Sequence, residues 1–434
     1  MSSHTIGIIG SGIAGCSMAY QVGTQSEEPA EIVVLERAPE MGGRIKLLSV
    51  GGHSVNAGGK YIHSSNEQLL GLANTLGLKL SRPIKPEQGP SGIWNGHRFV
   101  IRTDGSAWQT NVSLFRRYGL SILRIHRVTQ AFLCRFRRAY RPPVSTTGFE
   151  TPTDLLHAIG LDHLLWIPGD EYLRNEGISD RAIDEFVSAI TRNFYAQNPS
   201  EIHAFACLVA LVGGGTVGSV YTVEGGTIQF CQRLLERSNA TVKTDTEIRS
   251  IEADGSTVSV ATDTEDFEFD VLCIAAPLES ADISIGRSLR GVDLPEDIDF
   301  VRLESQFVVG ECSPEYFGSP DAPPGSVVTT ADSTEPFYDL HRQPTDGDTG
   351  PYVFALASRE PSVPVTETDI FYDVTEVQTI PWDAYPEFTP RSDTAPFRLH
   401  PNVYYINAME PVISAMETQV IASRNVWNVM KETD

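Results

Sequence analysis

Three glycines and one glutamate near the N-terminus have the spacing of a dinucleotide-binding turn. An apolar run leads into Gly10, Gly12 and Gly15, and Glu36 closes the next apolar run. In such a unit the first glycine makes the tight turn, the second lets the backbone approach a pyrophosphate, and the third lets helix and strand pack closely. The acid binds the ribose hydroxyls. Because these features arrive in the expected order, we predict a nucleotide site.

The residues beside these glycines would complete the phosphate site. Ser11, Ile13 and Ala14 lie where a helix is expected to begin, so free backbone N–H groups and the positive end of the helix dipole would face the phosphates. Arg37 directly follows the acid and is included among the expected cofactor contacts.

Two further glycine pairs favour FAD over NAD. Gly43 and Arg44 close the sequence Met-Gly-Gly-Arg, and Gly58 and Gly59 precede Lys60. This succession resembles the amine-oxidase-like flavoproteins. The resemblance implies that the first pair and its arginine lie along the diphosphate and that the second pair passes the isoalloxazine ring.

The same resemblance assigns residues from the rest of the chain to FAD. Near the C-terminus, a predicted strand and turn reach Met409 and Glu410, which would contact the ribitol-phosphate side. The helix that opens at Met416 would aim its dipole at the flavin pyrimidine edge and stabilise the reduced anion. Ile248 would offer its backbone to the adenine, and Ala276 would return beside the ribose and pyrophosphate.

The length of 434 residues exceeds what one core usually holds, so we expect two domains. The predicted fold is α/β: a Rossmann-type FAD-binding domain of the amine-oxidase-like kind, interleaved with a mixed α+β substrate domain. The FAD domain would comprise residues 1–80, 216–285 and 381–434. The substrate domain would comprise residues 81–215 and 286–380.

Local patterns predict the main elements between these pieces. Residues 92–101 indicate a strand pair, residues 152–212 are mostly helical, and residues 242–260 indicate a hairpin. Residues 270–277 indicate a buried strand that ends in a turn. Residues 314–351 are rich in Pro, Gly and Asp, which predicts a long loop or an exposed insertion.

Charge and cysteine usage limit the partners and the compartment. A net charge of −23 argues against nucleic acid. The sequence shows no leader pattern and no apolar run long enough to span a membrane, so we expect a cytoplasmic protein. Its six cysteines are scattered, so we expect reduced thiols and no metal site. Residues 113–141 contain eight arginines and no acid. This segment is either a helix pair that docks on an anionic membrane or a helix pair whose arginines meet the chain's own acids.

Several segments narrow the resemblance to the prenylcysteine oxidase (prenylcysteine lyase) family. They are Gly-Ile-Trp-Asn-Gly at 92–96, Arg-Asn-Phe-Tyr-Ala-Gln at 192–197, Val-Glu-Gly-Gly at 223–226 and Pro-Trp-Asp-Ala-Tyr-Pro at 381–386. Members oxidise a prenyl thioether with FAD and O₂, and they release a prenyl aldehyde, free cysteine and H₂O₂. The chain departs from the animal lysosomal members in its acidity and in lacking their secretory signal.

Six side chains are candidates for the substrate site, although each also has an ordinary structural interpretation. Lys60 could hold a water near the flavin or stabilise its reduced anion, but it could equally face solvent or pair with an acid. The other five are Tyr61, Trp382 and Tyr385 as aromatic walls, His63 as a proton donor and Glu224 facing the substrate amine. Asn193 and Tyr195 could also line the pocket.

Two other functions remain open at this point. The chain could be another flavin oxidase that acts on an amine or a polyene, or a prenyl-binding carrier without flavin chemistry. The closing segment with Glu410 and Met416 counts against the carrier. The sequence has no hydrolytic motif such as Gly-x-Ser-x-Gly or His-Glu-x-x-His, which suits hydride transfer to a flavin because that step needs little acid–base machinery.

Overall fold

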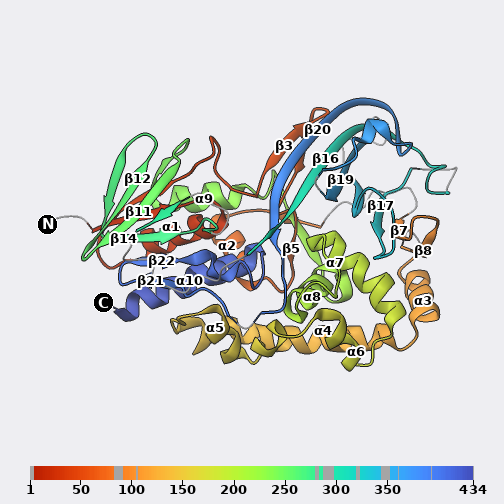
Figure 1. Ribbon diagram of the computed structural model, residues 1–434, viewed down its shortest axis with the longest axis horizontal. Helices are drawn as coiled ribbons and strands as arrows, with labels where there is room; N and C mark the ends of the chain where they lie inside the picture. The colour runs from red at the N-terminus through yellow and green to blue at the C-terminus, as the bar shows by residue number, and fades with distance from the viewer. Residues whose placement is uncertain are drawn as a thin grey trace.

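The computed structural model describes residues 4–82, 91–103, 106–278, 283–286, 298–318, 323–343, 352–359, 361–391 and 393–433. Figure 1 shows a nucleotide-binding layer at one end of the molecule, a curved sheet at the upper right and a layer of helices below it. Two long strands, β16 and β20, arch from the middle of the molecule across the top.

A six-stranded sheet forms the nucleotide-binding layer, in the order β10-β2-β1-β14-β22-β21. Its strands are β1 (His4–Ile9), β2 (Ala30–Leu35), β10 (Thr241–Lys243), β14 (Val271–Ile274), β21 (Arg398–His400) and β22 (Val403–Tyr405). All neighbours pair in parallel except β21 with β22. Ile8 is fully buried opposite Val34 and Cys273, as expected where both faces of a parallel sheet are covered.

Helices cover this sheet, and glycines let them approach closely. They are α1 (Ile13–Gln25), α2 (Glu67–Leu76), α9 (Gln229–Ser238) and α10 (Met416–Thr433). A Cβ at Gly15 would collide with the carbonyl oxygen of Gly10, and a Cβ at Gly23 would collide with the backbone of Ser238 in α9. Helix α1 therefore packs on β1 and on α9 at backbone distance, which only glycine permits at these two positions.

The predicted hairpin is confirmed in its second half and wrong at its start. Strands β11 (Ile248–Asp254) and β12 (Thr257–Thr262) pair around Gly255, and β13 (Asp266–Phe269) and β15 (Ser284–Ile285) extend this small sheet. Val242, however, belongs to β10, which pairs with β2 in the large parallel sheet. A short strand beside a parallel neighbour carries no turn signal of its own, so its partner could not be inferred from the local sequence.

A seven-stranded sheet forms the second layer, in the order β20-β16-β19-β18-β17-β7-β8. Its strands are β7 (Ser91–Trp94), β8 (Phe99–Arg102), β16 (Phe300–Cys312), β17 (Ser326–Thr329), β18 (Asp339–Arg342), β19 (Tyr352–Arg359) and β20 (Phe371–Pro386). The predicted strand pair β7–β8 is confirmed. Strand β20 continues across the domain boundary expected between residues 380 and 381.

The expectation of a long loop over residues 314–351 is wrong. Strands β17 and β18 lie inside it as interior strands of the seven-stranded sheet, and Val327 and Leu340 are fully buried there. Residues 319–322 and 344–351 of the same expectation lie outside the described residues. Each of these strands contributes only four residues, so Pro, Gly and Asp at the strand ends dominate the composition of the segment and conceal the strands.

Two small sheets connect the layers, and helices fill the space below the curved sheet. One is the hairpin of β3 (Leu47–Val50) and β4 (His53–Asn56), and the other is a three-stranded sheet in which β9 (Val220–Val223) lies between β5 (Ile62–His63) and β6 (Leu80–Ser81). The helices are α3 (Ala107–Tyr118), α4 (Ser121–Phe136), α5 (Pro152–Ile159), α6 (Gly169–Asn175), α7 (Ser188–Tyr195) and α8 (Ala204–Leu211). Within the described ranges, no helix is long and apolar enough to cross a membrane.

Helix α8 begins at the buried His203, which also bonds to the segment that follows β20. The backbone N–H of His203 donates to the carbonyl of Phe388 at 2.7 Å, and its ring Nδ1 accepts from the N–H of Ala206 at 3.1 Å. His203 is fully buried, and burial lowers its pKa to about 4.

His203 should therefore make the protein sensitive to mild acid. The unfolded chain takes up a proton near its ordinary pKa of about 6.5, whereas the folded protein resists protonation down to about pH 4, so stability falls as the pH drops between these values. His203→Asn retains a capping oxygen but has no group that titrates in this range. Between about pH 7.5 and 4.5, the free energy of unfolding should therefore fall by about 2–3 kcal/mol less in His203→Asn than in the wild type. Urea unfolding at both pH values checks this, and parallel losses in the two proteins would contradict it.

Candidate functional site

The glycine turn after β1 leaves an open backbone cradle. Gly10 has a φ of +95°, and a Cβ there would lie 2.9 Å from the carbonyl oxygen of Ala275. Gly12 is the N-cap residue of α1, and a Cβ built on it meets no atom within 4 Å. A Cβ at Gly43 would lie 3.5 Å from the Cα of Gly12, so the two glycine turns face one another. Free space over a helix N-terminus fits a pyrophosphate.

Glu36 lies at the end of β2 with its carboxylate turned toward this cradle. Its Oε2 accepts from the N–H and the Oγ of Ser11 at 2.8 and 2.6 Å, and its Oε1 accepts from the N–H of Ala38 at 2.9 Å. The residue is 9% exposed. These bonds fix the carboxylate beside the turn, where an acid of a dinucleotide site binds ribose hydroxyls.

An ion pair between the partly exposed Arg44, whose side chain is 38% exposed, and a buried carboxylate joins the first diglycine to the closing segment. The Arg44 guanidinium pairs with Oε1 of Glu410 and also donates to the carbonyl of Ala384 at 2.9 Å. The Glu410 side chain is 2% exposed, and it accepts further bonds from Asn407 at 2.7 Å and Ser414 at 3.0 Å. The pair thus connects residues that are far apart in sequence.

The second diglycine lies against the closing helix and the long strand β20. A Cβ at Gly59, whose φ is +62°, would lie 3.2 Å from Sδ of Met416. A Cβ at Gly58 would collide with the carbonyl of Arg44 and would lie 3.7 Å from the Trp382 ring. The segment that leads to Lys60 is therefore held between the two layers.

Some of the other predicted cofactor residues lie beside the cradle, and the rest lie on other elements. Ile13 and Ala14 open α1, and Ala276 follows β14, with its N–H 3.5 Å from a Cβ at Gly10. Met409 is buried in the 3₁₀ turn after β22, Ile248 is the buried first residue of β11, and Arg37 is exposed. Together with the open glycine cradle and the Glu36 carboxylate, this donor set fits FAD, and the individual contacts stay predictions.

One face of the seven-stranded sheet looks toward the second diglycine. Residues paired across antiparallel strands share a face. Phe307 pairs with Ala355, and Lys60 Nζ lies 6.0 Å from the centre of the Phe307 ring, which identifies the face that meets the nucleotide layer. Trp382 lies on this face and donates from Nε1 to Oγ of Ser305 at 3.0 Å. We call this surface the inner face of the sheet.

Aromatic side chains border the inner face where β20 ends. The rings of Tyr385 and Tyr195 meet edge to face at 5.3 Å, and Tyr195 also meets Phe388 at 4.9 Å. Burial raises the pKa of Tyr385 to about 12, so its phenol is neutral at physiological pH. The structure thus brings Lys60, Trp382 and Tyr385 to one region.

Two titratable residues on the same face were not found from the sequence. Asp339 pairs with Ala357, and His341 pairs with Ala355, so both lie on the inner face. Their spacing of two in a strand is the one signal for a shared face, and it was hidden because the segment was taken for a loop. His341 Nε2 also contacts Oδ1 of Asn193 at 2.9 Å, which brings Asn193 to this region.

Of the remaining three candidates, His63 and Glu224 do not join this group, whereas Tyr61 lies close enough to Asp339 to interact with it electrostatically. Both ring nitrogens of His63 contact backbone, Nε2 with the carbonyl of Val217 at 2.8 Å and Nδ1 with the N–H of Ser65 at 3.1 Å. Glu224 is exposed in the turn after β9. Tyr61 is 51% exposed. Their functional roles stay predictions.

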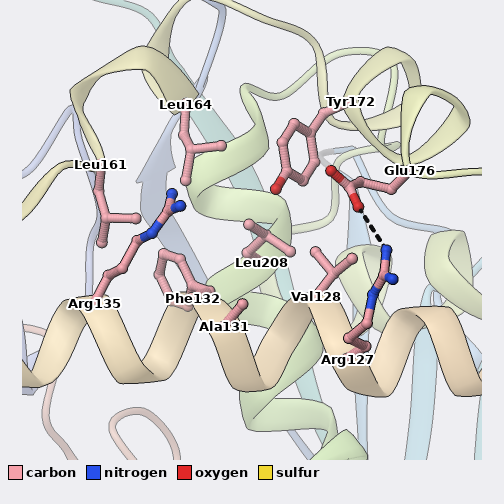
Figure 2. A pocket seen from close by; sticks show the side chains of 10 residues that line it. All are labelled: Arg127, Val128, Ala131, Phe132, Arg135, Leu161, Leu164, Tyr172, Glu176 and Leu208. Carbon is pink, nitrogen blue, oxygen red and sulfur yellow. Dashed lines mark hydrogen bonds and ion pairs between the residues drawn. The ribbon is translucent and has the colours of Figure 1, made fainter.

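A groove of about 330 Å³ opens elsewhere, along α4 in the basic segment. Figure 2 shows apolar side chains such as Phe132, Leu164 and Leu208 at its floor, and the ion pair between Arg127 and Glu176 at one side. None of the predicted cofactor or substrate residues lines it. The chemistry is better placed at the glycine cradle and the inner face, because that is where the predicted residues converge.

Known proteins resemble this chain over nearly its whole length. The family model for prenylcysteine lyase matches residues 101–433, and that for an NAD(P)-binding Rossmann-like domain matches residues 8–76. Farnesylcysteine lyase of Arabidopsis thaliana is 31% identical over 98% of this chain and 87% of its own length. Human prenylcysteine oxidase 1 is 28% identical over 97% and 87%.

Among solved structures, cyclohexylamine oxidase from Brevibacterium oxydans is similar to this chain with a TM-score of 0.67 at 16% identity, and 99% of each chain is covered. This likeness confirms the predicted amine-oxidase-like fold.

Gly12→Val should separate cofactor binding from folding. A Cβ at this position meets no protein atom within 4 Å and the φ of −68° suits valine, so the flavin-free protein should fold, but the side chain would occupy the space of the pyrophosphate. We expect purified Gly12→Val to lack flavin absorbance. Its far-ultraviolet circular dichroism spectrum should be the same as that of the wild type. Gly71→Val, in an open part of α2, is the control and should stay yellow. Flavin retained by Gly12→Val would argue against this cradle.

Breaking the Arg44–Glu410 pair should lower the free energy of unfolding far more than breaking an exposed ion pair does. Arg44→Met leaves the buried Glu410 carboxylate without its cation, which should lower the free energy of unfolding by about 3–5 kcal/mol. Arg302→Met, which removes an exposed pair with Asp383, should change it by less than about 1 kcal/mol. Urea unfolding of the flavin-free proteins measures both, and similar losses would contradict the difference in burial.

Proposed function

Because this chain belongs to the prenylcysteine lyase family, we propose that it is an FAD-dependent oxidoreductase that cleaves the thioether of a prenylcysteine. The products would be a prenyl aldehyde and free cysteine, with O₂ as the electron acceptor and H₂O₂ as its product. The observation that carries this proposal is the match of the family model over residues 101–433, combined with a glycine cradle that fits a dinucleotide.

The residues around the cradle and the two diglycines would hold the cofactor. Gly12 and the N-terminus of α1 would take the pyrophosphate, Glu36 the ribose, and Arg44 with the closing segment the ribitol side. When bound, FAD supplies an acceptor for a hydride from the substrate carbon next to sulfur.

The side chains of the inner face would bind and orient the substrate. Trp382 and Tyr385 offer apolar surface for the prenyl chain, the buried Tyr195 packs behind Tyr385, and Ser305 fixes the Trp382 ring. Loss of hydride leaves a cation shared by sulfur and the allyl system. The protein's task is then to hold the carbon in place and to limit the access of water.

We also propose that the enzyme works in the cytoplasm and reaches its substrate at an anionic membrane through residues 113–141. Exposed apolar side chains lie on or beside α3 and α4, among them Trp108, Leu120 and Leu123, which are 73%, 58% and 57% exposed. Exposed arginines accompany them on these helices. Such a surface suits a membrane from which a prenyl chain must be withdrawn.

Anaerobic flavin reduction tests the reaction. Farnesylcysteine or geranylgeranylcysteine should bleach the flavin, and in air should yield aldehyde and peroxide. A saturated alkyl cysteine should react far more slowly because no allylic cation can form. Equal rates would contradict that mechanism. Bleaching by polyamines alone would identify an amine oxidase, and binding without bleaching would identify a carrier.

Co-sedimentation with vesicles tests the membrane contact. Arg135, Arg137 and Arg138 are exposed, and among the described residues no acid pairs with them. Each should contribute on the order of 1 kcal/mol at low salt, so their replacement by Gln should weaken binding to anionic vesicles and leave FAD content unchanged.

The matched control changes three exposed arginines elsewhere. Arg233, Arg237 and Arg249 lie on α9 and β11, and their replacement by Gln makes the same change in net charge. This variant should bind like the wild type. Negligible binding of the wild type to anionic and neutral vesicles alike would overturn the membrane contact.

A further inference from the structure

Asp339 is a buried carboxylate on the inner face of the seven-stranded sheet. The residue is 8% exposed, yet no residue in the described part of the chain donates a hydrogen bond to its carboxylate. The His341 ring comes nearest, with Nε2 at 3.5 Å from Oδ1 of Asp339. A buried carboxylate without hydrogen-bond donors is costly, which suggests a purpose other than stability.

His341 is held as a neutral ring and so cannot neutralise this carboxylate. Its Nδ1 lies 2.8 Å from Oγ of Ser326, and its Nε2 lies 2.9 Å from Oδ1 of Asn193. Since the amide oxygen of Asn193 can only accept, Nε2 carries the proton and Nδ1 accepts from the serine hydroxyl. Burial lowers the pKa of His341 to about 3, which keeps the ring neutral.

The charged and titratable groups that face Asp339 come from the second diglycine segment and from β20. Lys60, Tyr61 and Tyr385 all interact with it electrostatically. Lys60 directly follows Gly59, which contacts Met416 of the closing helix. The carboxylate therefore faces the region in which the candidate substrate residues converge.

Resting on the proposed function, we propose that Asp339 accepts the proton of the water that adds to the oxidised substrate carbon. The substrate has by then lost a hydride, and its two electrons, to FAD. The water oxygen forms a bond to the cationic carbon, and one water proton passes to an Asp339 oxygen. The resulting hemithioacetal breaks its carbon–sulfur bond, its hydroxyl proton passes to sulfur, and aldehyde and free thiol leave.

The surroundings of Asp339 suit this task. Burial raises its pKa to about 7, and the Lys60 ammonium limits that rise. A base with a pKa near the working pH combines a usable fraction of carboxylate with enough basicity to take a proton, whereas an exposed aspartate is a far weaker base. Tyr61 and Tyr385 remain neutral phenols and His341 a neutral imidazole, and burial lowers the pKa of Lys60 from its ordinary value, so Asp339 is the carboxyl group of this cluster that ionises near neutral pH.

The test separates flavin bleaching from product release in single turnovers with farnesylcysteine. In Asp339→Asn, anaerobic bleaching should stay within about 3-fold of the wild type, while release of aldehyde and thiol should slow by at least about 100-fold. Asp339→Glu should recover part of the release rate. Asp332→Asn, an exposed aspartate beyond the end of β17, is the matched control and should behave like the wild type.

Two measurements support the test without relying on turnover of the variant. In the wild type, release but not bleaching should rise with pH up to about 7 and then level off, because the carboxylate form is required. In infrared spectra of the protein, the protonated carboxyl band that is missing from Asp339→Asn should titrate near pH 7. The pH dependence of release in the wild type remains decisive if Asp339→Asn does not fold.

The outcomes are distinct for the two proposals. If wild-type protein is not bleached by any prenylcysteine, the proposed function fails and the role of Asp339 fails with it. If the wild type is bleached but release in Asp339→Asn keeps pace with bleaching, only the role of Asp339 is overturned. If bleaching and release fall together, Asp339 serves the structure of the site, and the proton-accepting role is likewise overturned.

Discussion

The ion pair between Arg44 and the buried Glu410 carboxylate is the contact on which the rest of the site depends. One guanidinium meets the Glu410 carboxylate and the carbonyl of Ala384, so the N-terminal diglycine, the end of β20 and the closing segment are joined at one point. Taking the Glu410 carboxylate out of water is unfavourable unless further hydrogen bonds compensate, and Asn407 and Ser414 supply them. The same junction brings Met416 against Gly59, which positions the start of the closing helix relative to the segment that leads to Lys60.

The inner face of the curved sheet shows a second constraint. A sheet that packs on another layer ordinarily buries large apolar side chains, and Phe307 does so beside Val309 and Val353. Elsewhere on this face stand Ser305, Ala357 and Asp339, which contribute little apolar area. The β3–β4 hairpin packs on the apolar part of this face, and the Arg44 junction joins the end of β20 to the closing segment, so the remaining surface is available to the proposed substrate.

Features with a local cause could be predicted from the sequence. Gly10 and Gly15 are required by the turn and by the contact between α1 and β1, so their spacing alone indicated the nucleotide-binding fold. By contrast, β17 and β18 are four residues long, and they become strands because β7 and β19 lie beside them. The burial of Asp339 depends on those same distant partners, so no pattern within its own segment could have revealed it.

The basic segment shows how one helix pair can serve two purposes. Three of its arginines hold it in place through ion pairs, namely Arg117 with Glu185, Arg127 with Glu176 and Arg141 with Glu67. Arg124 donates to the carbonyl of Gly177. Arg116, Arg135, Arg137 and Arg138 are exposed and, within the described residues, have no acidic partner. Arg127 and Arg141 are 73% and 63% exposed, so among these pairs it is the less exposed Arg117–Glu185 pair that holds the helices most firmly. Charge at the four arginines without an acidic partner can therefore change without breaking that pair.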